Sequence, residues 1–180
     1  MKYTRLSVST IATIFSLLLA GPVHAHVDGS PHSGFIDGLL HPLSGADHLL
    51  AALAVGLWAG LARRSTARAP LLFTLALAAG LATGTGNGIP APLLETAIVA
   101  SLLSAGLLLF TAADPARPSM LALAASFGLI HGYAHGAALP EGTTLLPFAA
   151  GVMLSTGALT LVAQLAATTL RRSSTHTGRQ

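Results

Sequence analysis

Two pairs of histidines lie inside long apolar stretches of the sequence, where ionisable side chains are costly and therefore point to function. His41 and His48 stand in the segment HPLSGADH, which also contains Asp47. His131 and His135 stand in HGYAHG, four residues apart, so both project from the same face of a helix. Imidazoles and carboxylates are common ligands of transition metals. We therefore predict one buried metal site made of these four histidines and Asp47.

Several roles stay open for the individual residues. Asp47 can ligate the metal directly, or it can accept the ring N–H of a ligating histidine and so fix its tautomer. Any one membrane histidine can serve only as a hydrogen-bond partner between helices. His26 and His32 precede the first apolar stretch, where they can capture an ion or simply form a polar leader. Glu95 begins the third stretch, where the helix dipole alone also favours a carboxylate.

The composition excludes several other kinds of site. The chain of 180 residues has no cysteine, so disulfides, thiolate metal sites and a cysteine nucleophile are excluded. Only three methionines are present, which disfavours a thioether path for copper. Charged residues make up 8% of the chain and apolar residues 52%, whereas a soluble domain carries about 25% charged residues. We expect membrane lipid as the surroundings of this chain and no nucleic acid as a partner.

Five long apolar stretches must carry these residues. Each is about as long as a membrane-crossing helix, and backbone groups in lipid have to bond within their own segment. The predicted fold class is therefore all-α, a polytopic transmembrane bundle of about five helices after a signal peptide. The stretches cover 34–62, 70–86, 93–113, 119–139 and 144–170.

Glycines spaced four apart predict close packing between these helices, because small residues let helix backbones approach one another in lipid. They are Gly56 and Gly60, Gly80 and Gly84, and Gly128, Gly132 and Gly136.

The backbone of the first stretch is expected to be irregular near its histidines. Proline fits best at the start of a helix, so Pro42 predicts a helix start with His41 just before it. A continuous helix would instead place His41 and His48 on one side, nearly two turns apart. A broken backbone could free carbonyl groups toward a cavity.

The ends of the chain and the basic residues predict its topology. Residues 1–25 resemble a secretory signal peptide, with Val23-His24-Ala25 as the cleavage pattern, although an uncleaved first helix is the alternative. Residues 26–33 then form a periplasmic, histidine-containing N-terminus, 34–170 a transmembrane domain that carries the histidine motifs, and 171–180 a polar, disordered cytoplasmic tail. Beyond the signal peptide, arginines occur only in alternate connections and in the tail, which places the C-terminus in the cytoplasm of a bacterial inner membrane.

This topology puts both histidine motifs at a similar depth. Counting from the outer surface at 1.5 Å per residue, His41 to His48 lie about 10–20 Å deep, and His135 and His131 about 6–12 Å deep. A shared depth for two motifs so far apart in sequence favours one site over four unrelated hydrogen-bonding histidines.

At these residues the chain resembles the HupE/UreJ family of nickel permeases. The family pattern of His, five residues and Asp-His is met by His41, Asp47 and His48 within HPLSGADHLLAALAVGLWAG. A second pattern, Phe-His-Gly-x-Ala-His-Gly-x-Glu, is similar to the segment from Ile130 to Ala138, with Ile for Phe and Ala for Glu. Glu95 also falls where the family tends to keep an acid. The resemblance covers most of residues 1–157.

The resemblance implies transport of a divalent transition metal into the cytoplasm, with Ni²⁺ as the substrate and Co²⁺ or another divalent ion as chemically compatible alternatives. It also implies possible maturation factors for urease or hydrogenase as partners. A membrane accessory protein or sensor that binds metal without transporting it is a second interpretation, favoured by Ala138 in place of the family's acid. A membrane metalloenzyme is a third and weaker one, because no HExxH motif is present. We expect no enzymatic activity.

Overall fold

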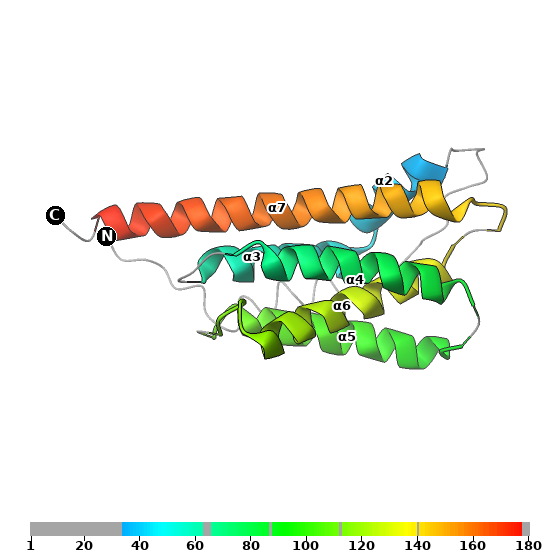
Figure 1. Ribbon diagram of the computed structural model, residues 1–180, viewed down its shortest axis with the longest axis horizontal. Coiled ribbons are helices and arrows are strands. Elements are labelled where there is room, and N and C mark those ends of the chain that lie inside the picture. Colours follow the sequence, from blue (N-terminus) through cyan, green and yellow to red (C-terminus); the bar gives the residue numbers. More distant parts are fainter. Residues whose placement is uncertain (1–33, 63–65, 87, 112, 140, 178–180) are drawn as a thin grey trace. The chain divides into compact units, whose positions relative to one another are not determined.

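The computed structural model describes residues 34–62, 66–86, 88–111, 113–139 and 141–177, with side chains up to 173. These residues all belong to one unit, Pro31–Gln180. In this described part the structure contains helices and no strands, as predicted (Figure 1). The helices are α2 (Gly34–Ser44), α3 (Ala46–Leu61), α4 (Arg68–Gly84), α5 (Ala91–Leu108), α6 (Pro118–Ala137) and α7 (Leu145–Thr177).

Helices occur at all five predicted positions, and the polytopic all-α fold class is confirmed. By length and composition α5 and α7 are long and apolar enough to cross a membrane. The α2–α3 pair counts as a third span if its two parts, bent by 76° at their break, are taken together. With 17 residues, α4 is just too short to count as a membrane span by this measure. Since α6 is not among the candidate spans either, crossing of the membrane by α4 and α6 stays a prediction. The predicted signal peptide lies outside the described residues.

Reciprocal glycine contacts hold α4 and α6 together side by side (Figure 1). A Cβ added at Gly80 would lie 2.3 Å from the Leu129 carbonyl oxygen. One added at Gly132 would lie 2.0 Å from the Leu77 carbonyl oxygen. Every glycine in the two predicted stripes faces the backbone of the other helix in this way, since no side chain keeps the two helices apart.

The second glycine-packed group joins α2 and α3 to α7. On α3, a Cβ at Gly56 would lie 2.3 Å from the Thr160 carbonyl oxygen of α7. Between α2 and α7 the approach is equally close, with Gly38 against the backbone of Phe148 and Gly151 against α2. Thus α7 serves as the common support of the two helices that carry the first histidine motif.

The remaining helix, α5, buries only one face. Its buried residues are Ile98, Ser101, Leu102 and Ala105, whose spacing matches one side of a helix. Leu103 and Leu107 point outward and are exposed. Such large apolar side chains on the surface are what lipid surroundings require.

Two local expectations were wrong. Pro42 lies inside α2, two residues before its end, and the break falls at Gly45. Proline removes only one hydrogen bond, to the residue four before it, so α2 can continue for half a turn before it ends. The tail is helical as far as Thr177, because extending an existing helix needs no new nucleation. Arg171 also donates a hydrogen bond from Nε to the Gly60 carbonyl (3.3 Å).

Candidate metal centre

The break between α2 and α3 places the first histidine motif. His41 lies in the last turn of α2, and Asp47 and His48 begin α3. Gly45 adopts an extended conformation between them, with φ −94° and ψ 112°. The His41 carbonyl accepts hydrogen bonds from the Gly45 N–H (3.3 Å) and from the Ser44 hydroxyl (2.9 Å). This carbonyl is therefore already bonded and is not freed toward a cavity.

The second motif comes from the middle of the bundle. His131 and His135 lie one turn apart on α6, and each is only 1% exposed. Gly132 and Gly136, the next residue after each histidine, face α4. The close α4–α6 contact therefore positions both histidines.

The imidazole rings of both motifs meet. The ring centroids of His48 and His135 lie 4.0 Å apart in a stacked arrangement, and those of His41 and His135 lie 4.8 Å apart. His41, His48 and His135 each offer one ring nitrogen, and these three atoms lie within 4.8 Å of one another. Metal–nitrogen bonds of about 2.0–2.1 Å allow donors at most about 4.2 Å apart, so a small inward movement of the rings suffices to hold one ion.

His135 shows the strongest sign of a missing ligand. Both its ring nitrogens are buried and have no hydrogen-bond partner. Buried polar groups are nearly always paired, and leaving one unpaired costs about 1–3 kcal/mol. A metal ion bound beside His41 and His48 would occupy one of these nitrogens, which fits the donor set.

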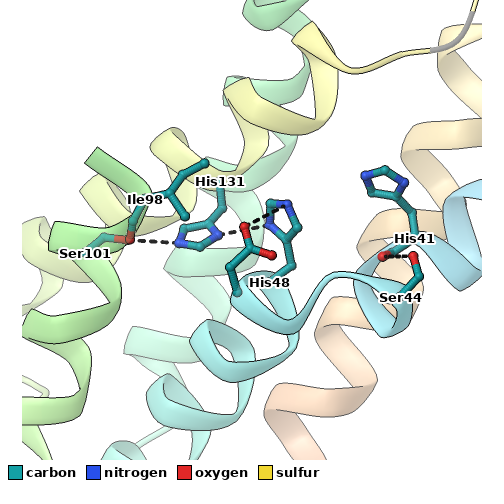
Figure 2. A network of polar contacts seen from close by, with 7 residues as sticks. His41, Ser44, His48, Ile98, Ser101 and His131 are labelled. Atoms are coloured by element: carbon teal, nitrogen blue, oxygen red, sulfur yellow. Dashed lines mark hydrogen bonds and ion pairs between the residues drawn. The ribbon is translucent and has the colours of Figure 1, made fainter. Parts of the chain in front are cut away.

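His131 differs from His135 because both its ring nitrogens have a partner. Its Nδ1 lies 3.0 Å from Nδ1 of His48, and its Nε2 lies 2.9 Å from the Ser101 hydroxyl. Ser101 in turn donates to the Ile98 carbonyl (2.7 Å). Figure 2 shows this chain of contacts running from α5 through α6 to α3. Sequence reasoning missed Ser101; its only signal is a hydroxyl on the same helical face as Ile98, Leu102 and Ala105.

Asp47 lies beside the histidines, and its Oδ2 is 3.6 Å from Nε2 of His48. The carboxylate is partly exposed and belongs to the same end of α3. All five residues predicted for the principal site are therefore brought together or linked through direct contacts.

The weaker candidates are placed differently. Glu95 lies on the exposed side of α5 and does not belong to the donor group. His26 and His32 lie outside the described residues. Across the part of the chain that the structure describes, no second group of three or more possible metal donors occurs.

Comparison with known proteins assigns the chain to a family. The family model described as HupE / UreJ protein matches residues 13–180. The chain belongs to the HupE/UreJ family. This confirms the resemblance drawn from the two motifs.

A curated relative supports the same assignment for this family member. The chain is similar to Protein HupE of Rhizobium leguminosarum bv. viciae, with 34% identity over 157 residues. The similarity covers 87% of this chain and 79% of the relative. No solved structure matches the chain.

Proposed function

We propose that this protein binds Ni²⁺ from the outer side of a bacterial inner membrane and carries it into the cytoplasm. The observation that carries the proposal is the convergence of His41, His48 and His135, with the buried nitrogens of His135 unpartnered. A structural role for these histidines would satisfy their nitrogens with hydrogen bonds, as it does for His131.

The chemistry of the donors limits the substrate to a class of ions. Neutral imidazoles and a carboxylate suit Ni²⁺, and they also suit Co²⁺, Zn²⁺ and Cu²⁺. The preference for nickel rests on the family membership. Ion selectivity belongs among the first quantities to measure.

The arrangement of basic residues supports the proposed inward direction. Arg63, Arg64 and Arg68 follow the first span, and Arg171 and Arg172 lie near the C-terminal end of the last helix. The positive-inside rule then places these ends in the cytoplasm and the opposite connections outside. Capture at His26 and His32 before delivery to the buried histidines completes the proposed inward route.

The test is uptake of radioactive nickel by right-side-out membrane vesicles. We expect wild-type protein to support uptake, His135→Ala to abolish it, and His176→Ala to leave it unchanged. His176 is the matched control, since it lies outside both histidine motifs in the sequence. Tight nickel binding by purified wild-type protein without uptake would favour the accessory or sensor interpretation. No binding and no uptake would reject a metal function.

A further inference from the structure

The hydroxyl of Ser101 determines the direction of a hydrogen-bond chain. Ser101 is 4% exposed on the buried face of α5, and its Oγ donates to the Ile98 carbonyl at 2.7 Å. A serine hydroxyl has one proton, so Oγ has only lone pairs left for its second partner. That partner is Nε2 of His131 at 2.9 Å. With the hydroxyl proton on the Ile98 carbonyl, His131 carries its own proton on Nε2 and donates it to Ser101.

The protonation of His48 follows from that of His131. A neutral imidazole has one N–H and one acceptor nitrogen, so Nδ1 of His131 is the acceptor. Nδ1 of His48 lies 3.0 Å away, and it can form this hydrogen bond only as the donor. Nε2 of His48 is then unprotonated, and its lone pair is free on the side where the Asp47 carboxylate lies.

We propose that Ser101 is a positioning residue for the metal site, acting through His131 to hold His48 in the tautomer that offers Nε2 to the ion. His131 then supports a ligand and does not itself bind the metal. This inference rests on the proposed metal function, and it adds which nitrogen binds and which residues set it.

Reversing the direction of these hydrogen bonds would give His48 the opposite tautomer. If Ser101 donated to His131, then His131 would donate to His48, and Nε2 of His48 would carry the proton. That proton would point at the Asp47 carboxylate and block the metal. The contact with the Ile98 carbonyl favours the first direction, because Ser101 has only one proton to donate.

Nickel titration of the purified full-length protein in lipid nanodiscs tests the role of Ser101. Outer partners of metal-ligating histidines change affinity by roughly 10–100-fold, and we expect a loss of this size in Ser101→Ala. Ser101→Thr keeps a hydroxyl that can bond to the same carbonyl, so it should retain most of the affinity. Ser104→Ala is the control, because Ser104 lies on the same helix but is exposed and bonds only to its own helix. Equal affinity of Ser101→Ala and wild type would overturn the inference.

A second pair of variants separates support from ligation at His131. Asparagine places its amide oxygen near the position of Nδ1, where it can still accept the N–H of His48. We therefore expect His131→Asn to bind nickel more tightly than His131→Ala, with the number of imidazole ligands seen by X-ray absorption unchanged from wild type. The loss of one imidazole ligand in His131→Asn would show that His131 binds the metal.

The tautomer itself is measured without metal. Nitrogen-15 spectra of histidine-labelled protein distinguish protonated from unprotonated ring nitrogens, and a His48→Gln spectrum assigns the His48 signals. We expect wild-type His48 to carry its proton on Nδ1 and Ser101→Ala to lose this single form. A proton on Nε2 of wild-type His48 would overturn the inference, whether or not the protein transports nickel. Absence of nickel binding with the expected tautomer would instead count against the proposed function alone.

Discussion

His135 is held in a position that costs stability in the metal-free protein. Both its ring nitrogens are buried and lack hydrogen-bond partners, although the ring packs against those of His41 and His48. His131, one turn away, is equally buried but fully bonded. The two residues have the same type, helix and burial, so a comparison of them isolates the effect of the unmet bonds.

The first prediction uses this contrast. His135→Leu removes two unsatisfied nitrogens, so the metal-free protein should unfold at the same or a higher temperature while nickel binding is lost. His131→Leu leaves His48 and Ser101 without their partner and should lower the free energy of unfolding by about 1–3 kcal/mol. Thermal unfolding in the presence of a chelator measures both. Equal destabilisation by the two changes would contradict the assignment of His135 as a binding rather than a structural residue.

Asp47 gives the second prediction at the residue scale. Its Oδ2 lies 3.6 Å from Nε2 of His48, the nitrogen assigned to the ion. Unit charges about 4 Å apart attract by about 4 kcal/mol at an effective dielectric constant of 20, and partial exposure of Asp47 reduces this. We expect Asp47→Asn to weaken nickel binding by at least about 10-fold, but less than His48→Ala does. Nickel titration of the variants measures this affinity, and an unchanged affinity in Asp47→Asn would show that Asp47 does not contribute to the metal site.

At the scale of the helices, the contact between α4 and α6 has almost no room for side chains. A methyl group at position 132 would lie 2.0 Å from the Leu77 carbonyl oxygen, so Gly132→Ala must push the two helices apart. Overpacking of this kind costs about 1–3 kcal/mol. Because His131 adjoins Gly132, nickel affinity should fall together with the unfolding temperature.

Gly106 is the control for this third prediction. It lies inside α5, and a Cβ there meets nothing within 4 Å. Gly106→Ala should be neutral or should stabilise the protein by about 0.5–1 kcal/mol, because alanine loses less freedom in a helix. If Gly132→Ala were tolerated as well as Gly106→Ala, the close α4–α6 packing would be wrong.

The sequence predicted the chemistry of the site better than its local backbone. Histidines in apolar stretches are rare and costly, so His41, His48, His131 and His135 could be identified by type alone. The bend could be anticipated from Pro42 but not placed, because it falls at Gly45 in an extended conformation that any residue can adopt.

Ser101 could not be found in this way. Serine is common in membrane helices and usually bonds to its own helix, as Ser104 does. Its role depends on which face of α5 meets α6, and this is decided by packing between residues 30 positions apart. Similarly, Glu95 has a suitable side chain, but the rotation of α5 leaves it exposed.

For the whole molecule, the fourth prediction concerns topology in the membrane. The chain has no cysteine, so a thiol reagent can label only the single cysteine that is introduced. A cysteine replacing Ser173 should react with impermeant reagents only from the cytoplasmic side, and one replacing Asn87 only from the outside. Labelling in whole cells and in inverted vesicles measures this. The reverse pattern would reject both the orientation and the inward direction of transport.

The close glycine contacts form two separate groups among the described helices. Backbone contacts join α2 and α3 to α7, and a separate set joins α4 to α6. His41 and His48 belong to the first group, and His135 belongs to the second. A bound ion would therefore add a link between the two groups of helices, which also touch where α4 meets α7. Any sliding of one group past the other would take the coordination sphere apart, so occupancy of the site and the relative position of the two groups must change together.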